Sequence, residues 1–374
     1  MLADRPYPNR PALDRPARAW WLWLLLFVVM QPSARAAFDP YQVAIPVADQ
    51  SASARRSAER EALSQVLFRL TGDAEALQRP ELAAARQAPQ NLFLRSGYAR
   101  IRDPELAASH PDARWLLELE VDRRGVLDLL AEAGIPAWTG RRPEILVVML
   151  EEDAEGERRL LEPTSEEARS LLRLGRERGL PLVVPLLDLQ DQLTLDVPEL
   201  WARFEDATAP LAERYRPDAI VILRRYQDAL GRWLVDWEGE VGGESLGSAL
   251  EIDAPEAAPK ELVERLAGRL IARYALRMGV GEEGGEILWL QVDGLSRVQS
   301  YAGLMRYLEG VSGVSRVQLV QVRDRSLLLR LDSTDAGERL LDLLRLEARL
   351  APRPEPEYFG DVAIWRARWI ADGG

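Results

Sequence analysis

Two carboxylates in the middle of the chain, Asp188 and Asp191, have the most promising setting for chemistry. They follow the apolar run Leu182–Leu187, which predicts a buried strand, and open α/β sheets bind ligands beyond the carboxyl ends of their parallel strands. Trp201 lies nearby, at the start of the next predicted helix. We therefore take Asp188, Asp191 and Trp201 as candidate ligand-binding residues, although turn formation and helix capping by the aspartates are the favoured alternative.

Three glycine motifs match catalytic or binding patterns in their letters but not in their context. Gly279–Gly284 fits the G-x-G-x-x-G pattern of dinucleotide sites, but it follows a predicted helix and precedes a strand, which is the reverse of the required order. Gly243–Gly247 fits the G-x-S-x-G nucleophile elbow, but it lies between two predicted strands. The fold that uses this elbow places its catalytic histidine later in the chain, whereas the single histidine, His110, precedes the motif. Gly310–Gly313 resembles the GxxG loop of KH domains and is better explained as the end of a helix. We predict no catalytic residue.

The residues that usually bind metals are nearly absent. The chain has no cysteine and a single histidine, His110, so thiolate sites and disulfides are excluded, and zinc would need carboxylate ligands almost alone. The acidic cluster Glu151–Glu155 predicts a solvated turn, because consecutive carboxylates repel one another. The sequence therefore predicts neither a metal site nor another cofactor.

Residues 1–36 have the pattern of a secretory signal peptide. Arginines precede the apolar run Ala19–Met30, and Ala34 and Ala36 place small residues at positions −3 and −1 of a cleavage site before Ala37. A helix of this run would be about 18 Å long, against roughly 30 Å for the hydrocarbon core of a membrane. We therefore expect a periplasmic protein without a stable membrane span; an inner-membrane anchor formed by an uncleaved signal is the alternative.

The charge balance restricts the class of partner. The formal net charge is −12 and almost every basic residue is arginine, Lys260 being the one lysine. A negative chain disfavours nucleic acid and anionic lipid as partners, because both carry negative charge themselves. We expect a protein partner in the cell envelope.

Three segments can be separated by their patterns, and the first, residues 37–140, predicts an α+β domain. Apolar residues alternate along a strand and recur at helical spacing along the following segment, which Thr71-Gly72 ends. Asp122 is a plausible cap of a later short helix, and another helix starts near Pro80. The main elements expected are strand Tyr41–Val47, a helix that starts at its cap Ser53 and runs through Leu70, strand Trp115–Val121 and helix Gly125–Ala133.

The second segment, residues 141–278, predicts an α/β domain. Its parallel βαβαβ core consists of strands Ile145–Leu150, Leu182–Leu187 and Ala219–Leu223 with helices Ser165–Arg178 and Pro198–Tyr215 between them. An antiparallel meander follows, with strands Arg224–Asp228, Trp233–Val241 and Ser248–Ile252, and helix Pro259–Arg277 closes the segment. Trp233 and Trp237 share one face of their strand. Core packing is the expected role of these tryptophans, and a surface for a partner or glycan is the alternative.

Residues 279–285 predict a flexible acidic linker, and residues 286–374 a third domain. The order of elements in this domain is βαββαβ, which is the ferredoxin-like arrangement. Its last strand, Val362–Trp369, follows a proline-rich stretch and places Trp365, Ala367 and Trp369 on one face. The other elements are strand Ile287–Val292, helix Val298–Leu308, strands Val314–Val322 and Leu327–Leu331, and helix Ala336–Leu350.

Short motifs spread over the segment after residue 36 resemble the DUF2066 family of uncharacterised proteobacterial envelope proteins. The matching residues are Tyr41-Gln42-Val43, Val47-Ala48-Asp49-Gln50-Ser51, Arg56, Ala58, Ala62-Leu63, Val66-Leu67, Thr71-Gly72, Gly134-Ile135-Pro136-Ala137-Trp138, Arg141-Arg142-Pro143 and Pro185-Leu186-Leu187-Asp188-Leu189-Gln190-Asp191. Thr139 departs from the pattern, where a glycine is expected after the tryptophan. The resemblance implies an exported protein of unknown activity and supplies no catalytic residues.

Taken together, these patterns favour a non-enzymatic interaction or accessory protein of the bacterial envelope, built from three small α/β and α+β domains that present sheet edges and grooves to a partner. Two alternatives stay open. One is a hydrolase of an envelope polymer that uses a pair of carboxylates, since two acids suffice for glycoside cleavage. The other is a module that binds a small ligand at Asp188, Asp191 and Trp201.

Overall fold

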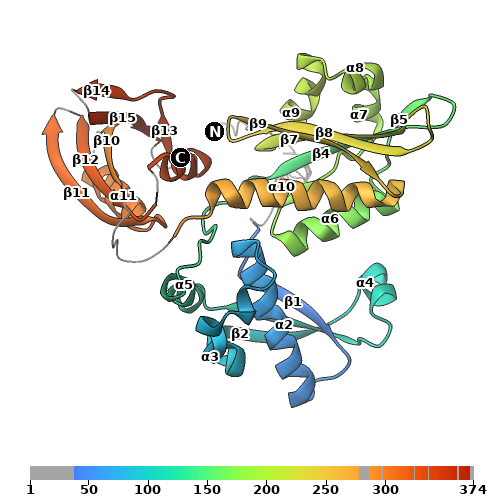
Figure 1. Ribbon diagram of the computed structural model, residues 1–374, viewed down its shortest axis with the longest axis horizontal. Coiled ribbons are helices and arrows are strands. Elements are labelled where there is room, and N and C mark those ends of the chain that lie inside the picture. The colour runs from blue at the N-terminus through green and yellow to red at the C-terminus, as the bar shows by residue number, and fades with distance from the viewer. Residues whose placement is uncertain are drawn as a thin grey trace, which may run out of the picture. The chain divides into compact units, whose positions relative to one another are not determined.

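A computed structural model describes residues 38–277, 286–295, 298–323, 325–335, 337–359 and 362–370. Phe38–Gly374 forms one compact unit. Within the described residues the protein has a mixed α/β structure with three sheets, one of three strands and two of six, and eleven α-helices (Figure 1). The predicted signal peptide and the 279–285 linker lie outside the described residues. None of the helices in the described ranges is long and apolar enough to cross a membrane.

The first sheet is antiparallel, with strand order β1-β3-β2, and helix α2 packs against it (Figure 1). Its strands are β1 (Gln42–Val47), β2 (Phe93–Arg100) and β3 (Trp115–Val121). Helix α2 (Ala52–Thr71) begins after Ser51, whose hydroxyl accepts from the Ala54 amide, so the expected start at Ser53 is wrong by two residues. It ends at Gly72, where φ of 70° suits a residue without a side chain.

Short helices replace the single helix expected near Pro80, because Pro80 and Pro89 interrupt the chain at short intervals. They are the 3-10 turns η1 (Ala76–Gln78), η2 (Pro80–Leu82) and η3 (Pro89–Leu92) and helix α3 (Ala83–Gln87). Helix α4 (Pro104–Ser109) and strand β2 were not predicted. Helix α5 (Arg123–Glu132) is capped by Asp122, as the sequence indicates.

The second sheet has strand order β5-β4-β7-β8-β9, and β6 pairs with β4. Strands β4, β6 and β7 are parallel, and β8 and β9 continue as the expected antiparallel meander. Helices α6 and α10 cover one face, and α8 and α9 cover the other (Figure 1). The strands are β4 (Ile145–Glu152), β5 (Arg158–Leu160), β6 (Leu182–Val183), β7 (Ala219–Gln227), β8 (Trp233–Val241) and β9 (Glu244–Ile252). The helices are α6 (Glu166–Arg178), α7 (Leu189–Thr194), α8 (Val197–Ala202), α9 (Ala209–Tyr215) and α10 (Ala258–Tyr274), with 3-10 turns η4 (Glu205–Thr208) and η5 (Pro255–Ala257).

Three predictions about this domain are wrong in extent. The strand expected over Leu182–Leu187 ends at Val183, and the helix expected over Pro198–Tyr215 is divided into α8, η4 and α9. The break follows Arg203, which has a left-handed backbone with φ of 59°. Arg224–Asp228 is not a separate strand, because β7 continues through it to Gln227.

The third sheet has strand order β11-β12-β10-β15-β13, and β14 pairs with β15. Helices α11 and α12 pack their leucines against the alternate buried residues of β10 and β12. The elements are β10 (Ile287–Asp293), α11 (Val298–Glu309), β11 (Val314–Arg323), β12 (Ser326–Ser333), α12 (Gly337–Leu346), β13 (Leu350–Pro352), β14 (Glu357–Phe359) and β15 (Val362–Trp369).

The predicted last strand is present as β15, but the sheet departs from a simple ferredoxin-like arrangement. Strand β15 runs parallel to β10, whereas all neighbouring strands of that arrangement are antiparallel, and β13 forms the edge beyond it. Helix α12 ends at Leu346 rather than Leu350, because Ala348 takes a left-handed conformation with φ of 55° and Leu350 enters β13.

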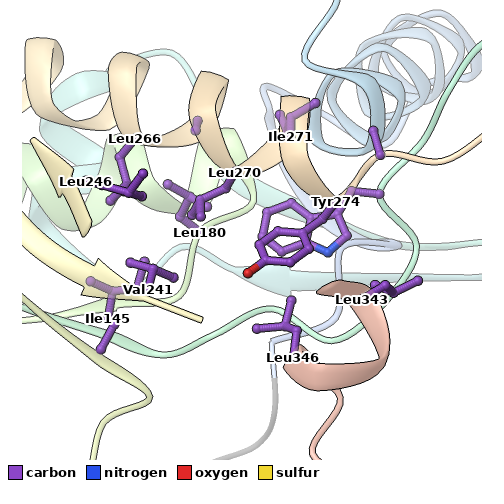
Figure 2. Close-up of a cluster of buried hydrophobic side chains, with 14 of the residues drawn as sticks. Ile145, Leu180, Val241, Leu246, Leu266, Leu270, Ile271, Tyr274, Leu343 and Leu346 are labelled. Atoms are coloured by element: carbon purple, nitrogen blue, oxygen red, sulfur yellow. The ribbon is translucent and has the colours of Figure 1, made fainter. Parts of the chain in front are cut away.

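The largest apolar core joins the second and third sheets. The ring centroids of Trp138 and Tyr274 lie 5.2 Å apart, and Leu343 and Leu346 of α12 belong to the same buried cluster as α10 (Figure 2). Trp237 is buried in this cluster and Trp233 packs against it. Core packing is therefore the role of both tryptophans, and the alternative of an aromatic binding surface is wrong for them.

Arg142 closes the carboxyl end of helix α2. Only 6% of this residue is exposed. Its Nη2 donates to the carbonyl oxygens of Arg69 at 2.8 Å and Trp138 at 3.0 Å, and its guanidinium lies 3.7 Å from the Trp138 ring centroid. Burial lowers the Arg142 pKa to about 9. A cation is favourable at this position because the last helical carbonyls carry partial negative charge.

Candidate functional site

Asp188 and Asp191 lie together at the start of helix α7. Asp188 is the N-cap of the helix, and its Oδ1 accepts a hydrogen bond from the Asp191 amide at 3.2 Å. Aspartate is favoured at this position because its carboxylate satisfies an amide that has no partner within the helix. Asp191 points inward and is only 1% exposed.

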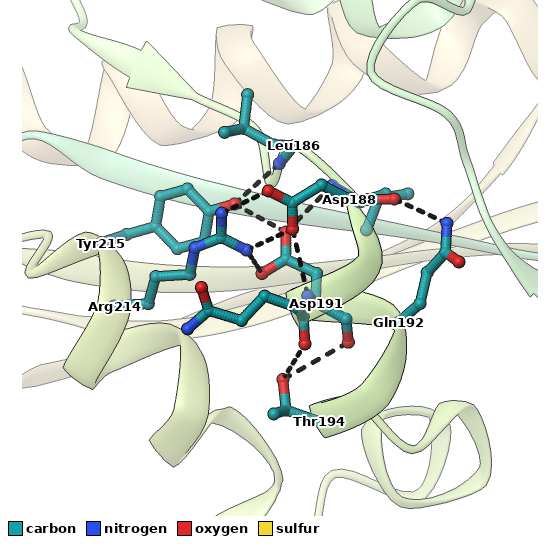
Figure 3. Close-up of polar contacts among 9 residues, drawn as sticks. Leu186, Asp188, Asp191, Gln192, Thr194, Arg214 and Tyr215 are labelled. Atoms are coloured by element: carbon teal, nitrogen blue, oxygen red, sulfur yellow. Dashed lines mark hydrogen bonds and ion pairs between the residues drawn. The ribbon is translucent and has the colours of Figure 1, made fainter.

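The end of helix α9 supplies the groups that bind both carboxylates (Figure 3). Arg214 binds Asp188 with Nη1 at 2.7 Å and Nη2 at 2.6 Å, and its Nη1 also contacts Asp191. The Tyr215 hydroxyl donates to Asp191 Oδ2 at 2.6 Å and accepts from the Leu186 amide at 2.8 Å. We call Asp188, Asp191, Arg214 and Tyr215 the α7–α9 network.

The electrostatics of the α7–α9 network keep the Asp188 carboxylate charged. The bidentate hydrogen bonds from Arg214 lower the Asp188 pKa to about 2, and the same pairing raises the Arg214 pKa. Burial, followed by the hydrogen bond to Asp191, raises the Tyr215 pKa. General acid catalysis needs a carboxylic acid whose pKa is raised toward the working pH, so Asp188 has the opposite property.

Trp201 is separated from the two aspartates in its contacts. It is buried in the cluster between the sheet and helices α8 and α9, with its ring centroid 6.0 Å from that of Tyr226. The guanidinium carbons of Arg158 and Arg224 lie 4.6 Å and 5.4 Å from the Trp201 centroid. The structure therefore brings Asp188 and Asp191 together and gives Trp201 a packing role of its own.

A groove of about 510 Å³ lies beside β7 and β8, and none of the three candidate residues lines it. Exposed Phe204 contributes the largest apolar side chain of its wall. Arg203 lines one part and forms ion pairs with Glu238 at 2.9 Å and with Asp236. Arg203 and Glu238 of the groove thus already have partners within the chain, as does Asp218, which pairs with Arg141 at 2.7 Å.

The acidic cluster after β4 is only partly the solvated turn that we expected. Glu151 is buried, and its carboxylate pairs with Arg225, and with Arg159 at 2.9 Å. Arg225 also binds Glu167 at 2.9 Å. The expectation is wrong for Glu151 because β4 continues through it, whereas Asp153 does organise a turn by accepting from the Glu155 and Glu157 amides.

No group of three histidine, cysteine, aspartate or glutamate side chains in the described ranges is arranged to hold a metal ion. His110 is exposed just after helix α4. Ser245 is exposed in β9, directly after a hairpin turn, and not on a strand-to-helix turn like that of a nucleophile elbow.

The feature that the sequence reading missed is an exposed leucine surface around α7. Leu186, Leu189 and Leu193 are 60%, 70% and 77% exposed. Leu189 and Leu193 are four residues apart on one helix and therefore lie on the same face. The spacing of Leu189 and Leu193 could have indicated an apolar helix face, but the sequence reading placed Leu186 in the predicted strand Leu182–Leu187 and predicted no helix over the residues that follow. We call Leu186, Leu189 and Leu193 the leucine patch.

The α7–α9 network holds the backbone that carries the leucine patch. Leu187 lies between Leu186 of the leucine patch and Asp188 of the network. Its backbone is left-handed, with φ of 50°, which costs a residue with a side chain about 1–2 kcal/mol. Its amide donates to Asp191 Oδ2 at 2.9 Å, and its carbonyl oxygen accepts from Gln192 Nε2 at 2.8 Å. The buried aspartate thus fixes a strained turn directly beside exposed apolar side chains.

Comparison with known proteins gives one family match. Residues 34–139 match "Domain of unknown function (DUF8605)", which covers less than a third of the chain. The resemblance to DUF2066 is therefore wrong, because the short motifs that suggested it belong at least in part to a segment that a different family describes. No curated protein matches the chain.

Solved structures share only a distant likeness. The lipoprotein GNA1162 from Neisseria meningitidis is 14% identical, with 34% of this chain and 96% of that chain covered. A competence or damage-inducible protein from Enterobacter asburiae is 14% identical, with 40% and 93% covered, and a CinA superfamily protein from Enterobacter cloacae is 13% identical, with 40% and 88% covered. All three have a TM-score of 0.21, a value too low to indicate a shared fold.

Proposed function

We propose that this protein is a non-enzymatic interaction protein of the bacterial envelope and that the leucine patch is its main protein-binding surface. The observation that carries the proposal is the exposure of Leu186, Leu189 and Leu193 on a segment that the α7–α9 network holds in one conformation. Exposed leucines on a rigid segment suit association, since burying them releases water at little cost in backbone entropy.

The pairing of the carboxylates disfavours the hydrolase alternative. A glycosidase needs two acids facing a substrate, one of them with a raised pKa. Asp188 and Asp191 share Arg214, Glu151 pairs with Arg225, and Asp236 pairs with Arg224 at 2.8 Å. Each of these acids is better explained as part of the framework than as a reacting group.

We also propose that the chain is exported to the periplasm after removal of residues 1–36, with an uncleaved inner-membrane anchor as the alternative. The three sheets support a division into domains over residues 37–140, 141–278 and 286–374. The family match over residues 34–139 supports the first of these boundaries. The shared core of the second and third sheets suggests that those two domains act as one body.

The proposal is tested with the double variant Leu189→Ser/Leu193→Ser. Leu230→Ser is the matched control, because Leu230 is 78% exposed but lies alone in the β7–β8 turn. After cross-linking in cells that produce the protein, the double variant is expected to lose its co-purifying partner while the control retains it. Both should keep the wild-type stability within about 0.5 kcal/mol, since surface changes rarely cost more. Equal recovery of partner by the double variant and the control would contradict the proposal.

A further inference from the structure

Strand β11 forms one open edge of the third sheet. It is ten residues long, and its neighbour in the sheet is β12 on one side only. Leu319, Val320 and Val322 are 39%, 50% and 62% exposed along it. An edge of this length presents unpaired backbone amides and carbonyls, which another extended chain can pair with.

The charges at the two ends of this edge have the same sign. Arg316 and Arg323 are exposed, and neither makes an ion pair within the part of the chain that the structure describes. Asp332 lies opposite Arg316 in the β11–β12 register, but its carboxylate pairs with Arg330 at 3.0 Å. Both guanidinium groups can therefore pair with carboxylates of another chain.

A bulge places both arginines on the same face. Their partners on β12 are Asp332 and Ser326, six residues apart, because the register shifts by one between Leu319 and Gln321. Six strand residues span about 20 Å at roughly 3.4 Å each. The edge thus offers two cationic groups about six strand residues apart on one face, with Gln318 and Gln321 between them, while Leu319 and Val322 lie on the opposite face.

The same charges disfavour a second copy of this chain as the occupant. In an antiparallel pair with its dyad between Leu319 and Val320, Arg316 of one copy faces Arg323 of the other. In an in-register parallel pair each arginine faces itself. Like charges opposite each other across strands are destabilising, so these two pairings are penalised.

We propose that β11 is a strand-addition site for an extended acidic segment of a partner protein. Two acidic residues of that segment, about six positions apart, pair with Arg316 and Arg323, and β-branched residues that alternate with them face the other side of the sheet and cover Leu319 and Val322. This site lies on the third sheet and does not depend on the leucine patch, so an experiment can disprove the binding role of one surface without disproving that of the other.

The experiment uses the whole chain from Ala37 and a labelled peptide of alternating valine and threonine with two aspartates six positions apart. A control peptide carries lysine in place of each aspartate. Fluorescence anisotropy should show saturable binding of the aspartate peptide, at least fivefold tighter than the lysine peptide, and weaker binding at high salt. Failure of the wild-type chain to bind the aspartate peptide, or equal binding of both peptides, overturns the proposal.

The matched variants are Arg316→Glu/Arg323→Glu and the milder Arg316→Gln/Arg323→Gln, which controls for any effect of charge reversal on folding. The glutamate variant should reverse the preference of the edge toward the lysine peptide, and the glutamine variant should bind both peptides alike. An unchanged preference in either variant overturns the proposal. A wild-type dimer in sedimentation velocity that survives charge reversal would identify a second copy as the occupant and would equally refute it.

Discussion

Tyr215→Phe tests the α7–α9 network with almost no change in volume. The substitution removes the 2.6 Å hydrogen bond to Asp191 Oδ2 and the acceptor of the Leu186 amide. A hydrogen bond to a charged group contributes about 1.5–3 kcal/mol, and Asp191 is too buried for water to replace the hydroxyl. The Leu186 amide belongs to an exposed residue and can bind water, so it adds little. We expect a loss of about 2–3 kcal/mol in the free energy of unfolding.

Urea denaturation measures this loss as a lower midpoint at constant m-value. Tyr358→Phe is the control, because Tyr358 is 69% exposed, and it should change stability by less than about 0.5 kcal/mol. Hydrogen exchange should also become faster over residues 186–194 in Tyr215→Phe, since the strained turn at Leu187 loses part of its support. A stability loss no larger than that of the control, or unchanged exchange in this segment, would refute the structural role of the network.

Three further predictions concern the other charged groups. Asp188→Asn should be less stable than wild type above about pH 4, because the folded pKa of about 2 lies below the unfolded value of about 3.9. The difference should shrink as the pH falls from about 4 and vanish below about pH 2, and thermal melting across this range checks it. Glu347→Gln should be more stable than wild type at pH 7 and equal to it below about pH 4. Burial raises the Glu347 pKa, which means that the folded state penalises the ionised carboxylate. A difference in melting temperature between variant and wild type that does not change with pH would be inconsistent with this. Arg142→Met should cost about 2 kcal/mol in urea denaturation, because the Arg69 and Trp138 carbonyl oxygens lose a charged donor; unchanged stability would mean that removing the buried charge offsets that loss.

Much of the secondary structure could be predicted where local patterns are strong. Strand β3 has the expected bounds, and helix α6 begins after Ser165 and ends before Gly179, which are favoured capping residues. The mixed arrangement of the second sheet also follows from its apolar runs. These features depend on residues close together in sequence.

The errors arise where distant residues override a local pattern. Leu186 and Leu187 look like the continuation of a strand, but the Leu186 amide binds Tyr215, and Leu187 turns into the left-handed region. The capping role of Asp188 could be predicted from its position before a helix, whereas its pairing with Arg214, 26 residues later, could not. Strand β15 could be predicted from its alternation, but its parallel pairing with β10 depends on the chain reversing direction between β14 and β15, since β13 and β14 both pair antiparallel with β15.

Site-specific photo-cross-linking determines directly whether the leucine patch binds a protein in the envelope. A photoreactive amino acid is placed at position 193 in the patch and, in a separate chain, at the equally exposed control position 230. We expect a discrete protein adduct from position 193 and none from position 230. The absence of an adduct from position 193 at wild-type protein levels, or the same adduct from both positions, would contradict it.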